Sequence, residues 1–227
     1  MDQVPRGIQN LGQTCYAAAA LQCLRALSVD GPWNHPGTNV SGLVATTTEP
    51  GDAHEFLMSL LERWNLDRLV SGTYVVRTLC TQCKTAKLTK DPFVFIRAVR
   101  EPPETIEGYA CRTCKTHVTQ ARRACRFWKL PPVVVGLGPS FADVQTFETK
   151  DVHGNYVYDR KGFVVYVPGK MHYIAIVCHR GSWFLCDDAS VRKISGEPPR
   201  TLPVTMTLYE TGHLKHMGCQ GKTYPKK

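Results

Sequence analysis

The sequence has no long hydrophobic run, and this absence excludes a membrane-spanning helix. None of its apolar stretches approaches the roughly 18 residues that such a helix requires. Residues 1–6 lack the apolar core of a secretory signal peptide, and internal repeats and low-complexity tracts are missing as well. We therefore expect a globular protein with no membrane span.

Acidic residues are also scarce. The chain carries 19 of them against 28 basic residues, which gives a formal net charge of +9. This balance is compatible with an anionic neighbour such as RNA or an anionic membrane surface, and also with a basic solvated surface. With 227 residues and 43% apolar composition, the chain can bury a full core as one large domain or as two small lobes.

The ten cysteines have a spacing that suits a metal better than a disulfide framework. Four of them form two Cys-x-x-Cys pairs, Cys80 with Cys83 and Cys111 with Cys114, as tetrahedral zinc sites do. Four thiolates fill the coordination shell of one ion, so we expect one structural Zn²⁺ ion. The four thiolates and the ion together contribute two negative charges, which lowers the net charge to about +7. Others, such as Cys23 and Cys178, fit buried free thiols. A reducing compartment and a cytoplasmic location follow.

Residues 1–70 have a helical pattern. Good helix formers follow Cys15 without an early glycine or proline. A second helix is expected after Asp52, a suitable N-cap with Glu55 three residues later. Residues 31–50, rich in Gly, Pro, Thr and Asn, are expected to form a loop.

From about residue 72 the pattern changes to strands rich in β-branched and aromatic residues. The expected strands are residues 73–79, 84–89, 93–99, 131–135, 163–167, 173–177 and 183–186. Helices followed by antiparallel strands predict an α+β protein. The polar residues 212–227 are expected to form a frayed tail.

Cys15 is the first candidate for a catalytic group. It lies where an irregular, glycine-containing segment is expected to become a helix. The unpaired N–H groups and the positive dipole end at a helix N-terminus favour a thiolate, which is the form a nucleophile needs. Position alone leaves open a small buried thiol on a helix face.

Four sequence blocks resemble, in the same order, the motifs of the ubiquitin-specific proteases, which are papain-like cysteine peptidases that remove ubiquitin from proteins. These blocks are the cysteine segment of residues 7–16, the acidic helix motif of residues 51–57, the two Cys-x-x-Cys pairs, and the histidine segment of residues 172–173 and 183–188. Because they span nearly the whole chain, it resembles a compact and divergent member of this family.

The resemblance implies a papain-like cysteine peptidase fold with a helical thumb, an antiparallel β palm and short zinc-ribbon fingers. Within a catalytic domain of residues 1–211, the thumb would take about residues 1–70, the fingers about 72–126 and the palm about 127–211.

The resemblance also implies a role for each site residue. Cys15 would be the nucleophile and His172 its general base. His172 begins an expected strand directly after a tight turn, where a side chain can face a cleft. Asp187 would orient the His172 ring, with Asp188 as a supporting or substitute partner that points to the other face if the strand continues. Asn10 would donate to the oxyanion beside the Cys15 backbone N–H.

Several positions depart from the family pattern. Gln13 stands where asparagine is usual, Gly51 where glutamine is usual, and Met171 where glycine is usual. The chain is also shorter than most relatives. These departures suggest a minimal enzyme, for which a virus-encoded origin in a larger polyprotein and a location in the host cytoplasm form one hypothesis.

The function that these observations favour is a thiol-dependent deubiquitinase cutting after the C-terminal Gly-Gly of ubiquitin or of a ubiquitin-like modifier. Its partners would be ubiquitin and ubiquitinated proteins, and the chain is expected to be a monomer. The alternatives are a protease that processes a polyprotein and a non-catalytic module that binds ubiquitin or RNA. Cations near the Cys-x-x-Cys pairs favour RNA, namely Arg112, Lys115, Arg122 and Arg123.

Overall fold

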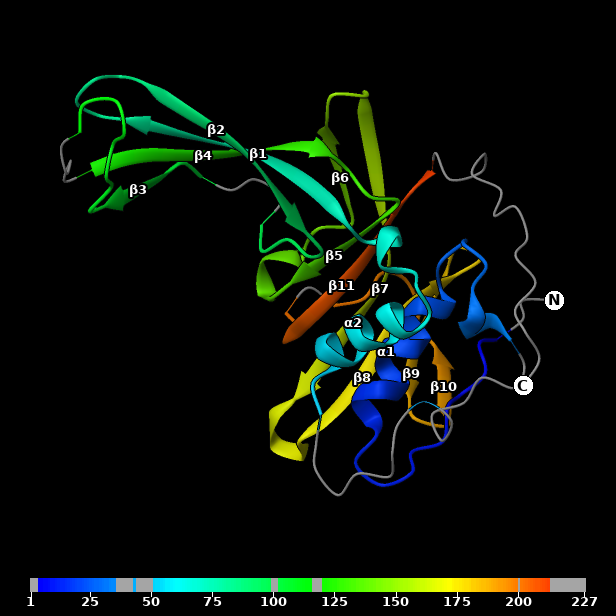
Figure 1. Cartoon of the computed structure of the whole chain (residues 1–227). Helices are drawn as coiled ribbons and strands as arrows, with labels where there is room; N and C mark the ends of the chain where they lie inside the picture. The colour runs from blue at the N-terminus through cyan, green and yellow to red at the C-terminus, as the bar shows by residue number, and fades with distance from the viewer. Residues whose placement is uncertain are drawn as a thin grey trace.

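The computed structural model describes residues 4–35, 43, 51–98, 102–115, 120–199 and 201–212. Two α-helices, two sheets and several short 3-10 turns form these parts of the chain. Figure 1 shows both helices packed together in front of the larger sheet, while the smaller sheet projects from the body as an arm. No helix in the described ranges is long and apolar enough to cross a membrane.

The larger sheet has seven strands and forms the body of the protein. Its strands are β5 (Val133–Leu137), β6 (Thr146–Lys150), β7 (Asn155–Val167), β8 (His172–His179), β9 (Ser182–Asp187), β10 (Ser190–Lys193) and β11 (Val204–Thr211). They pair antiparallel in the order β10-β9-β8-β7-β11-β5, and β6 pairs with the first part of β7. The sheet confirms the last four strands expected from the sequence.

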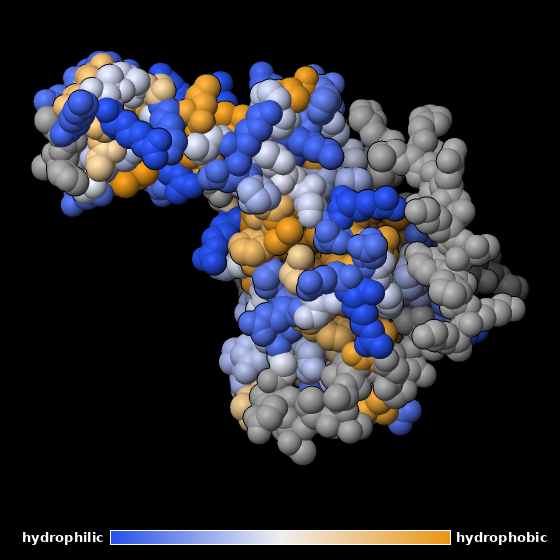
Figure 2. All heavy atoms as spheres, viewed as in Figure 1, coloured by the Kyte–Doolittle hydropathy of each residue, from blue (hydrophilic) through white to orange (hydrophobic). Residues whose placement is uncertain are grey.

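The smaller sheet forms the arm. Its strands are β1 (Gly72–Cys80), β2 (Ala86–Phe93), β3 (Glu104–Glu107) and β4 (Gln120–Lys129), paired antiparallel in the order β2-β1-β4-β3. Figure 2 shows mostly hydrophilic side chains over the visible side of this arm. At its base, the rings of Tyr74, Phe93 and Phe127 pack together and join a core cluster of the body.

The two helices pack on each other and on the body sheet. The helix α1 (Cys15–Arg25) is buried along almost its whole length, because its alanines leave room for close packing. A Cβ atom at Gly162 of β7 would lie 3.3 Å from Cys23 Sγ, so the glycine lets α1 approach the sheet. The helix α2 (Ala53–Arg63) begins at its expected cap, because the Asp52 carboxylate accepts from the N–H groups of His54 and Glu55.

The prediction of a strand over residues 93–99 is wrong. The strand β2 ends at Phe93, and of the following described residues only Ile96 makes a bridge, parallel to Gly136 of β5. The side chains of Phe93 and Ile96 are buried where the arm meets the body, so the segment between them passes from one sheet to the other. The apolar run in the sequence therefore marks a buried connection. The tail is described only at Gly212, and residues 213–227 of the expected tail lie outside the described ranges.

Candidate active site

Cys15 is the first residue of α1, as the sequence predicts, and its side chain is 7% exposed. Gly12 has a φ of +119°, which a non-glycine residue rarely adopts, and it turns the preceding segment into the helix. Helical hydrogen bonding starts when Ala17 and Ala18 donate to the Thr14 carbonyl. The N–H groups of Cys15 and Tyr16 therefore precede the helical pattern and are available at the helix N-terminus.

His172 is the first residue of β8 and follows the 3-10 turn Pro168–Lys170. Its partner across the hairpin is Val167, the last residue of β7. The His172 Nε2 atom lies 2.7 Å from Asp187 Oδ1, so this ring nitrogen donates to the carboxylate when it carries the proton. The imidazole is thereby held through one nitrogen, and Nδ1 is left for another partner.

Asp187 is the last residue of β9, which pairs with β8 as expected. Asp188 does not continue the strand, because its φ of +50° turns the chain. The continued strand that would have turned Asp188 to the other face is therefore absent. The Asp188 Oδ2 atom lies 3.9 Å from His172 Nε2, so both carboxylates face the same imidazole.

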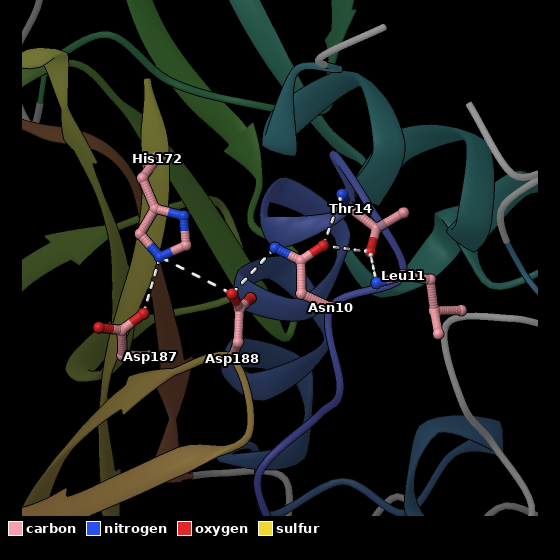
Figure 3. A network of polar contacts seen from close by, with 6 residues as sticks. All are labelled: Asn10, Leu11, Thr14, His172, Asp187 and Asp188. Atoms are coloured by element: carbon pink, nitrogen blue, oxygen red, sulfur yellow. Dashed lines mark hydrogen bonds and ion pairs between the residues drawn. The ribbon is translucent and has the colours of Figure 1, made fainter. Parts of the chain in front are cut away.

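Asn10 is held by a hydrogen-bond network that connects Asp188, after β9, with Thr14, before α1 (Figure 3). Its Nδ2 donates to Asp188 Oδ2 at 2.9 Å, while its Oδ1 accepts from the Thr14 backbone N–H and hydroxyl, both at 3.1 Å. Leu11 N in turn donates to Thr14 Oγ1 at 2.9 Å. The amide is therefore oriented from both ends, and Nδ2 retains a second N–H.

One cavity of about 660 Å³ brings the candidate residues together. Its lining includes Asn10, Cys15 and His172, which come from the segment before α1, from α1 and from β8. The rest of the lining is Gly12, Gln13, Tyr16, Gly51, Asp52, Glu55, Tyr166, Lys170, Met171 and Tyr173. A buried thiol, an imidazole held by a carboxylate and an oriented amide are the groups that nucleophilic attack on a carbonyl requires.

Tyr173, next to His172, also lines this cavity. Burial raises the pKa of its phenol, and the nearby Asp52, Tyr166 and Cys15 raise that pKa further. A tyrosine hydroxyl is protonated at neutral pH even without this shift, so it can serve as a hydrogen-bond donor at the cavity wall.

The four cysteines of the two Cys-x-x-Cys pairs form a second cluster, at the arm. Their sulfur atoms all lie within 4.8 Å of one another, with Cys80 to Cys114 at 3.9 Å and Cys83 to Cys111 at 3.6 Å. Four sulfurs bound about 2.3 Å from one zinc ion in a tetrahedron would be about 3.8 Å apart. The cluster therefore has the size of a closed metal site with four cysteine ligands.

The two pairs have the same local geometry. Lys84 N donates to the Cys80 carbonyl, Lys115 N donates to the Cys111 carbonyl, and both lysines have φ near the left-handed value (58° and 54°). Hydrogen bonds from Thr85 lower the pKa of Cys83 to about 6. Thiolates are the metal-binding form, so the environment of Cys83 favours metal binding, while the pKa of Cys80 is raised.

None of the nine cysteines in the described ranges forms a disulfide. Burial raises the pKa of Cys186 to about 12 and also raises that of Cys23, so both remain neutral core thiols. Cys178 is only half-buried, so the expectation of a buried thiol is wrong at this position.

Sequence reasoning misses two contributors to the site. Thr14 reads as a neutral residue before the helix, yet it binds the Asn10 amide through two groups. The sequence indicates Asp188 only as a partner of His172 and does not predict its hydrogen bond to Asn10. The Asp-Asp pair is the one available signal in the sequence, and an aspartate at this position also suits the left-handed turn that follows β9.

The chain shares its fold with solved structures of deubiquitinase modules, while no family model and no curated protein matches it. One match is the SAGA DUB module Ubp8/Sgf11/Sus1/Sgf73 bound to monoubiquitin, with 16% identity, a TM-score of 0.67, and coverage of 91% of this chain and 69% of the other. The same module bound to ubiquitin aldehyde matches with 17% identity and a TM-score of 0.68 over 91% and 69% of the two chains. A yeast SAGA DUB module with a variant Sgf73 matches with 18% identity and a TM-score of 0.69 over 91% and 68%. At these identities the matches show that the chain shares the fold of the Ubp8 structures.

Proposed function

We propose that this chain is a thiol-dependent deubiquitinase that hydrolyses the peptide or isopeptide bond after the C-terminal Gly-Gly of ubiquitin or of a ubiquitin-like modifier. The observation that carries the proposal is that Asn10, Cys15 and His172 line one cavity, while the Asp187 carboxylate lies within hydrogen-bond distance of His172 Nε2. The shared fold with Ubp8 modules bound to ubiquitin supports the substrate class.

In this proposal His172 takes the proton of the Cys15 thiol on Nδ1, since Nε2 is bound to Asp187. The thiolate attacks the carbonyl carbon of the terminal glycine, and the tetrahedral intermediate collapses as His172 returns the proton to the leaving amine. A water molecule, deprotonated by His172, then hydrolyses the thioester and regenerates the Cys15 thiol. Asp187 keeps the ring in the tautomer that both steps need.

The developing oxyanion requires donors that are oriented before the reaction. Asn10 Nδ2 has one N–H bound to Asp188 and a second one left over, and the Cys15 backbone N–H lies at the helix N-terminus. We assign these two groups to the oxyanion. Asp188 would then act through Asn10, as a positioning residue.

The role proposed for Zn²⁺ is structural. Cys80, Cys83, Cys111 and Cys114 would hold one ion, which links the turn after β1 to the turn after β3 and so ties the strands of the arm together. Four thiolates leave no open coordination position, so the ion takes no part in hydrolysis.

The proposed partners are ubiquitin and ubiquitinated proteins, with ubiquitin-like modifiers as further candidates. Asp52 and Glu55 line the cavity at the N-terminus of α2, and their charge suits a basic substrate segment. A cleft too narrow for side chains would admit a terminal Gly-Gly and exclude tails that end in larger residues, which would make the enzyme selective for ubiquitin-like tails. Because the catalytic thiol has to stay reduced, we also propose that the enzyme works in the cytoplasm.

The test is the release of a fluorophore from the C-terminus of ubiquitin by the wild-type chain and by Cys15→Ala and His172→Ala. We expect turnover by the wild type only. A folded, zinc-loaded wild type that binds ubiquitin without turnover would instead make the chain a non-catalytic ubiquitin-binding module. Cleavage of extended peptides with no response to ubiquitin would favour a polyprotein-processing protease.

A further inference from the structure

The two faces of the arm sheet differ sharply in charge. Residues directly opposite each other in an antiparallel pair share a face, as do alternate residues along a strand. In β1, Arg77 therefore shares its face with Val75 and Leu79. Val75 lies opposite Lys90 and Arg126, and Leu79 lies opposite Arg122. We name this surface, with Arg77, Lys90, Arg122 and Arg126, the basic face.

The four cations of the basic face are exposed and follow the length of the arm. They occupy three successive cross-strand rows, those of Val75, Arg77 and Leu79, which are about 7 Å apart along the strand direction. Neighbouring strands in each row are about 4.8 Å apart. The face is thus a narrow positive track that follows the strand direction.

The positive charges on this face are not paired with carboxylates of the described part of the chain. The acidic residue on this face of the four strands is Glu107, which lies opposite Gln120 at the far end. Arg123, on the other face, contrasts with them because it pairs with Glu104 at 3.0 Å and Asp91 at 3.8 Å.

Apolar groups lie between the cations. The Lys90 ammonium lies 3.6 Å from the centre of the Trp128 ring, and Leu88, opposite Arg77, is 66% exposed. Proteins bind single-stranded nucleic acid with cations that neutralise the phosphates and with aromatic rings on which the bases stack. A flexible strand can also follow a twisted track, whereas a membrane surface presents a plane.

We propose that the basic face binds single-stranded RNA through its phosphates, separately from the cavity that holds Cys15. This differs from the cations suggested by the sequence, since of Arg112, Lys115, Arg122 and Arg123 only Arg122 belongs to the basic face. The neutralisation of four phosphates gives the interaction a defined dependence on salt.

Fluorescence anisotropy with a labelled uridine oligonucleotide of roughly 12 nucleotides tests the proposal on the whole, zinc-loaded chain. Four phosphate contacts predict that the logarithm of the binding constant falls against the logarithm of salt concentration with a slope of about −2.8. The double variant Arg77→Ala/Arg126→Ala should bind more weakly at every salt concentration, with a slope of about −1.4. Arg122→Ala alone should reduce the slope by about 0.7.

The matched control is Lys87→Ala/Arg192→Ala. It removes the same number of charges from an exposed position on the other face of β2 and from an exposed position on β10. We expect this control to keep the wild-type slope, with all variants melting at the wild-type temperature. An equal loss in the control would show general charge attraction and overturn the proposal. Binding to phosphatidylserine vesicles without binding to the oligonucleotide would overturn it in favour of a membrane surface.

Discussion

The side-chain amide of Asn10 donates to the carboxylate of Asp188 at 2.9 Å, across 178 positions of the sequence. The backbone supports this pairing, because Ile8 N also donates to the Asp188 carbonyl at 2.8 Å. The segment before Cys15 is therefore attached to the turn after β9. A substitution at this turn should therefore change the orientation of the Asn10 amide, the proposed oxyanion donor, and leave the position of Cys15 unchanged.

Asn10→Ala is expected to lower kcat for the ubiquitin C-terminal substrate by about 10²–10³ and to leave KM nearly unchanged, because one oxyanion donor is lost. Asp188→Ala should lower kcat by a smaller factor, since the Asn10 amide remains present but is less well oriented. Steady-state kinetics at saturating substrate measure both effects.

The double variant distinguishes positioning by Asp188 from an independent role. If Asp188 acts through Asn10, then Asp188→Ala should cost little more once Asn10 is already alanine. Fully additive losses in log kcat would contradict this, and would instead show that Asp188 acts on His172 directly. Ser190→Ala, an exposed position in the next strand, serves as the control.

Removal of the metal should loosen the arm at the end that carries the two cysteine pairs, away from its packed base. Among the described residues, the apolar cluster at the cysteine pairs adds only Tyr109 to the four cysteines, so bound zinc would supply much of the local stability. We expect one zinc ion per chain by metal analysis, and a loss of this ion together with a lowered Tm in Cys83→Ser and Cys114→Ser.

Cys178→Ser gives the matched control, because it also removes a partly buried thiol but lies in β8, outside the cluster. It should retain the zinc ion. A full zinc content and an unchanged Tm in Cys114→Ser would contradict a site built from four cysteines.

Features that depend on local chemistry could be predicted from the sequence. The start of α1 at Cys15, the Asp52 cap and the start of β8 at His172 all follow from helix formers, a capping residue or a tight turn within a few residues. The gathering of the four cysteines likewise follows from two short spacings.

Features that depend on long-range register could not be predicted. The faces on which Arg122 and Arg123 lie are fixed by the pairing of β4 with β1 and β3, and adjacent residues of a strand point to opposite sides. The direction of Asp188 depends on a left-handed turn that its sequence permits but does not require. The apolar residues after Phe93 fit a strand as well as a buried connection, and only tertiary contacts distinguish the two.

Gly51→Ala is expected to destabilise the protein and to disturb the cavity. A Cβ atom at this position would lie 2.5 Å from Cζ of Tyr16, a buried ring that packs edge-to-face on Phe56. Displacement of a packed ring typically costs about 1–3 kcal/mol, which for a protein of this size lowers Tm by several degrees. Because Tyr16 follows Cys15 and lines the cavity, kcat should fall as well.

Gly169→Ala is the matched control for this substitution. It introduces the same methyl group in the turn before His172, where no atom lies within 4 Å of the added Cβ. Thermal melting should show a wild-type Tm for Gly169→Ala, and an equally unaffected Gly51→Ala would show that the Tyr16 ring does not occupy this space.

Met171→Gly is expected to stabilise the protein. Met171 has φ 46° and ψ 48°, a left-handed conformation that costs a residue with a side chain about 1–2 kcal/mol. Its side chain is 72% exposed, so little packing is lost on truncation. The greater freedom of glycine in the unfolded chain offsets about 0.5–1 kcal/mol of the gain. Met171→Ala keeps the strained backbone and should therefore melt below Met171→Gly, so the opposite order would refute backbone strain at this position. If both variants also lose kcat/KM to a similar extent, the Met171 side chain itself contacts the substrate, which would explain why a methionine occupies a position suited to glycine.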